Sequence, residues 1–141
     1  GGRRITQQHE FAVHDLGARG IGAILVHRPD DDPFPTVELR LPVPPPLQID
    51  RPADLGPLSH ALAQVDGAAV FDIAGVLRQM GVRLVPSPES EADVDGYRGM
   101  RHTAGRRYSR DDAFATVIVV SEDGPVTVFR DGEVEGRSEP M

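Results

Sequence analysis

Cysteine and lysine are both absent from this sequence of 141 residues. Without cysteine the chain can form neither a disulfide nor a thiolate metal site, so any metal ion must bind oxygen or imidazole ligands. Such ligands favour magnesium, manganese or calcium over structural zinc. The absence of lysine means that all 15 basic residues are arginine, a bias that we attribute to a GC-rich genome rather than to function.

Long hydrophobic runs are also lacking. No apolar stretch approaches the roughly 20 residues that a membrane-spanning helix needs, and the first residues lack the charged and then apolar pattern of a secretory signal. The sequence therefore predicts a cytoplasmic protein with no membrane segment. The formal net charge of -7 argues against broad, non-specific binding to duplex DNA or to anionic membranes, because both surfaces repel an acidic protein.

The composition, with 39% hydrophobic and 26% charged residues, is that of an ordinary globular protein. A chain of this length suffices for one hydrophobic core but hardly for two, so we expect a single domain over residues 1–141. Apolar patterning predicts helices over 7–20, 55–64 and 102–111, and strands over 21–28, in two runs within 65–85 and in two runs within 115–134. Because the last two pairs of strands are hairpins, the expected fold class is α/β, with a mixed sheet flanked by helices.

Proline is concentrated between Pro29 and Pro57, where nine of the 13 prolines lie. Proline cannot donate a hydrogen bond to an interior strand pairing, so we expect loop and edge strand here, with 37–41 as the extended segment. A linker between two domains is the less favoured alternative, because the flanking apolar segments are too short for separate cores. A second loop is expected over 86–99, which is polar and rich in turn-forming residues.

Positive charge gathers between Gly96 and Arg110, a segment that holds five of the arginines of this acidic chain. Gly96 and Gly99 precede the predicted helix at 102–111. Anions bind at helix N-termini, because the first amides have no intrahelical partner and the helix dipole is positive there. Arg101 and His102 stand at that end, and arginine presents a planar fork that suits phosphate oxygens. The alternative is a solvated helix face whose arginines pair with the acidic surface.

Two short acidic motifs are candidates for metal binding. Asp66 and Gly67 lie between a predicted helix and a predicted strand, where an Asp-Gly pair is often only a turn. Ser121, Glu122 and Asp123 end an apolar strand, as in many hairpin exits. Carboxylates at such strand and helix ends also hold hard metal ions, so each motif by itself leaves both interpretations open.

The order and spacing of these motifs resemble the diadenylate cyclase (DAC) domain family, which includes the nucleotide-binding domain of the DNA-integrity scanning protein. That family carries an Asp-Gly-Ala motif, then an Arg-His-Arg motif, and then a strand that ends in Val-Val-Ser-Glu. Here Asp66-Gly67-Ala68 precedes Arg101-His102-Thr103 by 35 positions, and Val119-Val120-Ser121-Glu122 follows. Segments 16–28 and 80–88 are similar as well, so the resemblance covers about residues 11 to 134.

The resemblance implies a bacterial nucleotidyltransferase. In that family two domains face each other, and two ATP molecules are joined into the second messenger cyclic di-AMP with release of two pyrophosphates. The implied catalytic residues are Asp66, Arg101 and His102, and the implied ligands of Mg²⁺ or Mn²⁺ are Asp66, Glu122 and Asp123. The implied nucleotide-binding residues are Gly67, Ala68, Gly81, Leu84, Arg101, His102, Thr103, Arg106 and Ser121.

Thr103 departs from the family pattern, because it stands where the family has its second arginine. Loss of one charged phosphate contact is expected to weaken transition-state binding by about 2.7–4 kcal/mol, unless Arg106 or Arg107 reaches back from the next helical turn. A second hypothesis is therefore a degenerate member that binds a nucleotide without converting it and serves as a regulatory module. A third is an interaction module whose arginine-rich helix docks an acidic partner.

Overall fold

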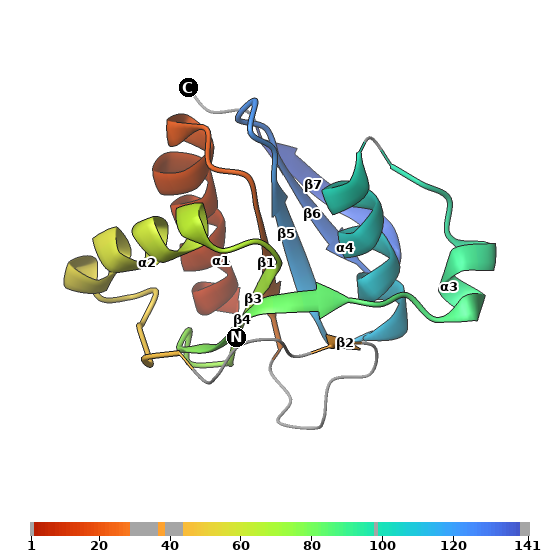
Figure 1. Cartoon of the computed structure of the whole chain (residues 1–141), viewed down its shortest axis with the longest axis horizontal. Helices are drawn as coiled ribbons and strands as arrows, with labels where there is room; N and C mark the ends of the chain where they lie inside the picture. Colours follow the sequence, from red (N-terminus) through yellow and green to blue (C-terminus); the bar gives the residue numbers. More distant parts are fainter. Residues whose placement is uncertain (1, 29–36, 39–43, 98, 139–141) are drawn as a thin grey trace.

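A seven-stranded sheet forms the centre of the computed structural model, with helices on both of its faces (Figure 1). The structure describes residues 2–28, 37–38, 44–97 and 99–138. The strands are β1 (Ala23–His27), β2 (Val37–Glu38), β3 (Ala68–Phe71), β4 (Leu77–Leu84), β5 (Thr116–Val120), β6 (Val126–Arg130) and β7 (Glu133–Ser138). Their order is β2-β4-β3-β1-β5-β6-β7, with β1 and β3 parallel and the other neighbours antiparallel. This mixed sheet confirms the α/β fold class predicted from the sequence.

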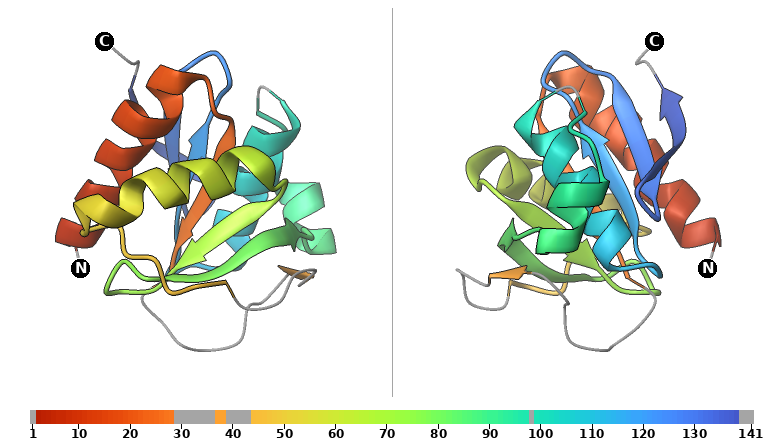
Figure 2. Two further views of the ribbon diagram at one scale, coloured as in Figure 1. Left: turned by 60° about the vertical axis from the view of Figure 1, so that its left-hand side comes forward. Right: turned by 90° about the vertical axis from the view of Figure 1, so that its right-hand side faces the viewer.

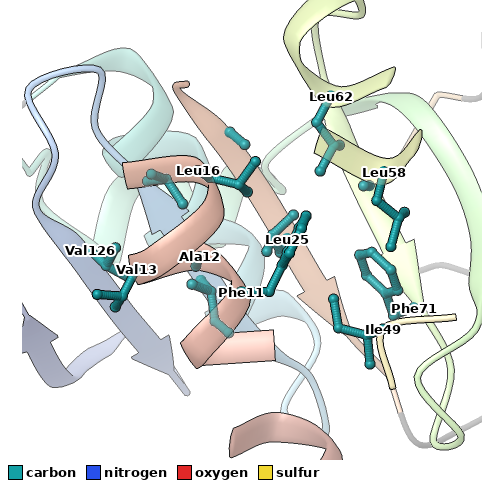
Figure 3. Packing of buried hydrophobic residues seen from close by; sticks show 14 of the residues in the cluster. Phe11, Ala12, Val13, Leu16, Leu25, Ile49, Leu58, Leu62, Phe71 and Val126 are labelled. Atoms are coloured by element: carbon teal, nitrogen blue, oxygen red, sulfur yellow. The ribbon is translucent and has the colours of Figure 1, made fainter. Parts of the chain in front are cut away.

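One face of the sheet is covered by the N-terminal helical segment and by α2 (Figure 2). The N-terminal segment consists of α1 (Gly2–Phe11), a π-helix (Ala12–Leu16) and a 3₁₀ turn (Gly17–Arg19), and α2 spans Pro52–Gln64. Phe11, Leu16 and Leu58 from these helices belong to the same buried cluster as Leu25 and Phe71 from the strands (Figure 3). Burial of this apolar surface holds the two helical segments on the sheet.

The opposite face is covered by α4 (Met100–Asp111), with the short helix α3 (Pro88–Asp93) beside it (Figure 2). Tyr108 of α4 shares a second buried cluster with Val117 of β5 and Phe129 of β6. At Gly105 the helix lies so close to the sheet that an added Cβ would be 2.7 Å from Cγ2 of Val119. This close packing fixes the N-terminal end of α4 relative to β1 and β5.

A buried ion pair connects the residue after β1 with the C-terminal end of α4. Arg28 Nε donates a hydrogen bond to Asp112 Oδ2 at 2.5 Å, and both side chains are buried. The hydroxyl of Tyr108 donates to the same oxygen at 2.8 Å. Burial, followed by the neighbouring Asp112 carboxylate, raises the pKa of the Tyr108 phenol, so its hydroxyl remains a donor at physiological pH.

Helix α3 lies within the segment 86–99 that the sequence predicts as a loop. Ser87 caps this helix by accepting a hydrogen bond from the amide of Ser90 at 3.1 Å. Asp111 of α4 accepts hydrogen bonds from the hydroxyls of Ser87 and Ser90, at 2.6 and 2.5 Å. The prediction is wrong here because a carboxylate 21 or more residues away in the sequence holds this helical turn in place.

Other boundaries differ from the prediction as well. The helix predicted at 7–20 begins at Gly2 and changes from α to π geometry after Phe11. The strand predicted last is two strands, because a turn at Asp131 and Gly132, with φ of 51° and 77°, starts β7. Such positive φ values are typical of tight hairpin turns with an Asp-Gly pair. Of the predicted extended segment 37–41, residues 37–38 form β2 and 39–41 lie outside the described residues.

Candidate functional site

Three strand ends meet at one edge of the sheet, next to the N-terminus of α4. Strands β1 and β3 run parallel with Ile24 opposite Ala68, so the residues Gly22 and Gly67 that precede them lie at the same edge. Strand β5 runs antiparallel to β1, so its C-terminal end reaches that edge too. The topology thus gathers the Asp-Gly-Ala and Ser-Glu motifs, which are far apart in the sequence, around one place.

Two hollows open at this edge. The first, here called the Asp66 hollow, has a volume of about 330 Å³, and its lining includes Gly22, Val65, Asp66, Gly67, Arg101 and Glu122. The second, the Ser121 hollow, has a volume of about 390 Å³, and its lining includes Met100, Arg101, His102, Ser121, Glu122 and Asp123. Both volumes lie within the roughly 300–1,000 Å³ of small-molecule sites. Arg101 and Glu122 line both hollows, and we call the place where these two side chains lie the junction of the hollows.

The positive charge at the junction comes from Arg101 and from the N-terminal end of α4. Arg101 Nη2 and Glu122 Oε1 are 3.4 Å apart, with the side chains 40% and 69% exposed. An ion pair this exposed contributes little to stability, so the guanidinium can exchange its carboxylate partner for a ligand at small cost. The N-cap residue of α4 is Gly99, which has no side chain to accept hydrogen bonds from the first amides of the helix. The helix dipole adds partial positive charge at this end. Phosphate is the kind of group that such an end binds.

Packing between β3 and β4 explains the glycine of the Asp-Gly-Ala motif. Gly67 has a φ of +106°, and an added Cβ would lie 2.8 Å from the carbonyl carbon of Gly81. Gly81 itself has a φ of 66°, and the register between the two strands shifts just beyond, between Ala68 and Val70. The positive φ and the contact with β4 therefore explain a glycine at position 67 without any role in nucleotide binding. Asp66 stands exposed on the wall of the Asp66 hollow.

Some predicted nucleotide-binding residues serve the core instead of the hollows. Ala68 is buried in the cluster beneath α4, and Leu84 packs against the same cluster. Gly81 lies in β4 against Gly67, as described above. None of the three lines either hollow, so the structure does not bring their side chains together with Asp66 and Arg101.

His102 and Thr103 face different surroundings although they are adjacent. His102 is 7% exposed, and its ring lies near those of Tyr97 and Phe129, at centroid distances of 5.8 and 6.5 Å. It also contributes to the lining of the Ser121 hollow. Thr103 Oγ1 accepts a hydrogen bond from the amide of Tyr97 at 3.0 Å and donates one to the carbonyl of Tyr97 at 3.3 Å. Thr103 therefore fastens the preceding segment to α4, and it lines neither hollow.

The arginines one turn further along α4 are directed away from the hollows. Arg106 Nε donates to the carbonyl of Gly132 at 2.8 Å, and its Nη1 donates to the carbonyl of Asp95 at 3.4 Å. Arg107 Nε donates to the carbonyl of Val94 at 3.1 Å. In this structure neither guanidinium takes the place of the arginine that Thr103 replaces.

The donor set for a divalent metal is small. Asp66 and Glu122 line the Asp66 hollow, whereas Asp123 lines the Ser121 hollow, where its amide donates to Ser121 Oγ at 3.3 Å. In the described part of the chain, no three side chains of His, Cys, Asp or Glu converge into a metal-binding group. Two carboxylates on one hollow nevertheless fit Mg²⁺ or Mn²⁺, because such ions are commonly held by one or two carboxylates together with substrate phosphates.

Sequence reasoning missed the chain that precedes β1. Gly20, Ile21 and Gly22 all line the Asp66 hollow. The signal was present in the sequence as two glycines flanking one residue directly before an apolar strand. Glycine in that setting indicates a turn or a close approach, but nothing local identifies the group that approaches.

An arginine and a helix N-terminus at one edge of an α/β sheet suit a ligand that carries phosphate. The family described as "DAC: DisA bacterial checkpoint controller nucleotide-binding" matches residues 10–134. The chain belongs to this family, which confirms the resemblance inferred from the three motifs. The match includes Asp66, Arg101, Glu122 and Asp123, the acidic residues and the arginine that line the two hollows.

Two solved structures share the fold. A hypothetical membrane spanning protein from Bacillus cereus matches with a TM-score of 0.63 and 20% identity, over 87% of this chain and 58% of that chain. A double mutant of DacA from Staphylococcus aureus matches with a TM-score of 0.57 and 21% identity, over 96% of this chain and 86% of that chain. This chain thus spans little more than half of the Bacillus cereus chain. Among the described residues, no helix has the length and apolar character needed to cross a membrane. No curated protein matches the sequence.

Proposed function

We propose that this domain is a metal-dependent diadenylate cyclase that condenses two ATP molecules into cyclic di-AMP. The observation that carries the proposal is the convergence of Asp66, Arg101 and Glu122 on one hollow at the edge of the sheet. These residues come from three separate segments, and a carboxylate next to an arginine at a helix N-terminus suits chemistry on a phosphate ester. Membership of the DAC family and the structural likeness to DacA support the same activity.

The proposed reaction needs two chains. Each chain offers one such edge, so two copies must face each other to bring two ATP molecules together. The 3′-hydroxyl oxygen of each ATP forms a bond to the α-phosphorus of the other and gives up its proton to solvent. The bond from each α-phosphorus to the bridging oxygen of the β-phosphate breaks, and two pyrophosphates leave. Positioning and charge neutralisation, rather than covalent catalysis, carry such a transfer.

The residues of the two hollows divide this work. Arg101 binds phosphate oxygens through its planar fork, while the N-terminal end of α4 adds positive charge beside it. Asp66 and Glu122 would hold Mg²⁺ or Mn²⁺, which supplies neutralisation of phosphate charge and lowers the pKa of the attacking hydroxyl. His102 and Ser121 extend the polar lining on the far side of Arg101.

Binding of a nucleotide without conversion is the second candidate function. It is favoured by the contacts of Thr103, Arg106 and Arg107, which all bind backbone groups of the protein. Among the described residues, Arg101 is the arginine that lines the hollows, whereas the family pattern provides two arginines. A regulatory module would require only the affinity for the nucleotide and not the alignment of two of them.

The test is incubation with ATP and either Mg²⁺ or Mn²⁺, followed by chromatography for cyclic di-AMP. We expect product at a rate that rises steeply with protein concentration, because two copies must meet. Asp66→Asn should lower the rate by at least about 100-fold, whereas Asp93→Asn, at the end of α3 and outside both hollows, should leave it unchanged. Absence of product with either metal at high protein concentration contradicts the cyclase.

Calorimetry separates the remaining alternatives. Binding of ATP or cyclic di-AMP without turnover supports the second candidate. If neither ligand nor other nucleotides bind, both proposals fail, and a domain that docks an acidic partner through its arginines becomes the better account.

A further inference from the structure

Gly22, the residue directly before β1, contacts the charged pair at the junction of the two hollows. An added Cβ at this position would lie 2.6 Å from Nη1 and 2.8 Å from Cζ of Arg101, and 2.8 Å from Cγ of Glu122. The guanidinium thus lies directly against the bare backbone of Gly22. Every amino acid other than glycine has a Cβ, so only glycine leaves this space for the guanidinium.

Backbone conformation does not account for the glycine. Gly20, two residues earlier, has a φ of 72°, but Gly22 is not among the described glycines with positive φ. The left-handed conformation that favours glycine is therefore not the reason for a glycine at this position. What the glycine provides at position 22 is space for Arg101 and Glu122.

We propose that Gly22 is a positioning residue, which leaves room for the Arg101 guanidinium at the junction, where it lines both hollows. The inference rests on the proposed function, in which Arg101 binds the phosphates of ATP. A methyl group at position 22 would push the guanidinium out of this place. Displacements of about 1 Å in a phosphate-binding group are enough to reduce catalysis strongly.

The atoms that Gly22 meets determine which property a substitution changes. Arg101 is 40% exposed, and the atoms in question are the far end of a flexible side chain, so the guanidinium can swing into solvent while the fold stays intact. Gly17 offers the contrast, because an added Cβ there would lie 2.6 Å from the backbone oxygen of Gly124. Substitution of Gly17 should therefore reduce stability, whereas substitution of Gly22 should reduce ligand binding.

The first experiment compares Gly22→Ala with the wild-type chain and with Gly136→Ala. Gly136 lies in β7, and an added Cβ there meets nothing within 4 Å. We expect Gly22→Ala to weaken ATP binding in the presence of Mn²⁺ by about tenfold or more, the effect of losing a charge-assisted hydrogen bond. Its Tm should stay within about 2 °C of the wild-type value. Unchanged affinity, or a large loss of Tm, would overturn the proposal.

A double-mutant cycle tests whether Gly22 acts through Arg101. In an Arg101→Ala background, Gly22→Ala should cause no further loss of ATP affinity, because the group that it displaces is gone. If the two losses are additive, the methyl group obstructs the ligand itself and the proposed role is wrong.

A third measurement does not depend on nucleotide binding, and so separates failure of this inference from failure of the proposed function. The rate at which phenylglyoxal modifies Arg101 can be followed by peptide mass spectrometry. Gly22→Ala should raise this rate, because the guanidinium moves away from the backbone of residue 22 into solvent. The rate for Arg110 on the same helix should stay constant. An unchanged Arg101 rate overturns the positioning role even if the wild-type chain binds no ATP.

Discussion

Replacing Gly105 by alanine tests how closely α4 packs against the sheet. The added Cβ would lie 2.7 Å from Cγ2 of Val119 and 3.2 Å from Cγ1 of Val117. Both valines are fully buried and β-branched, so their methyl groups cannot rotate away easily. Overpacking of this kind costs about 1–3 kcal/mol, and the higher helix propensity of alanine returns about 0.8–1 kcal/mol.

The expected net effect is a loss of about 0–2 kcal/mol in the free energy of unfolding, with a midpoint of about 1 kcal/mol. In a domain of this size a loss of about 1 kcal/mol corresponds to a decrease in Tm of about 3–5 °C. Urea unfolding followed by circular dichroism measures the first quantity, and thermal unfolding measures the second. Gly136→Ala, in open space on β7, is the control for a glycine-to-alanine change without a steric conflict.

Removal of the opposing methyl groups should relieve the conflict. Val119→Ala alone is destabilising because it leaves a cavity, but the double variant with Gly105→Ala should lose less than the sum of the two single losses. A Gly105→Ala variant that is more stable than the wild type, or losses that simply add, would show that α4 is not in tight contact with β5 at this point.

The remaining predictions concern buried polar groups. Burial lowers the pKa of His27 from 6.5 to about 4. Below pH 6.5 the unfolded chain therefore takes up a proton that the native state does not bind. About 3 kcal/mol of stability is present in full above pH 6.5 and should be lost as the pH falls toward 4. His27→Gln should flatten this part of the pH dependence of urea unfolding, and an equal slope in the variant would contradict the argument. Asp112→Asn should reduce stability by about 3–5 kcal/mol, because the buried guanidinium of Arg28 loses its carboxylate. Tyr108→Phe should lower the free energy of unfolding by only about 1 kcal/mol. If Asp112→Asn and Tyr108→Phe unfold at the same urea concentration, the ion pair is not the larger contribution to stability.

Much of the fold could be predicted from the sequence because its signals are local. Strand β1 and the hairpin of β5 and β6 are continuous apolar runs, and α4 follows a glycine-containing segment. Helix α3 could not be predicted in this way, since its serines depend on Asp111, which lies outside the segment. Strand β7 has a local signal, the Asp-Gly pair at positions 131 and 132. The prediction included this pair in the preceding strand instead of in a turn.

The candidate site likewise has features that the sequence predicts and features that depend on the tertiary structure. The spacing of Asp66, Arg101 and Ser121 in the sequence indicated one site, and the structure places all three on two hollows that share Arg101. The roles of Gly67 and Thr103 could not be read in the same way. Their packing partners, β4 and the backbone of Tyr97, are defined only when the strands and α4 are in place.

Helical periodicity determined from the sequence alone that His102 and Arg106, four residues apart, lie on one face of α4. Only the tertiary structure decided what that face meets: the ring of Phe129 for His102 and the carbonyl of Gly132 for Arg106. Periodicity fixes how side chains are directed relative to each other, whereas the groups that they bind come from distant segments. For this reason the sequence showed where the arginines are clustered. Only the tertiary structure showed that, among the described arginines, Arg101 lies at the junction of the hollows.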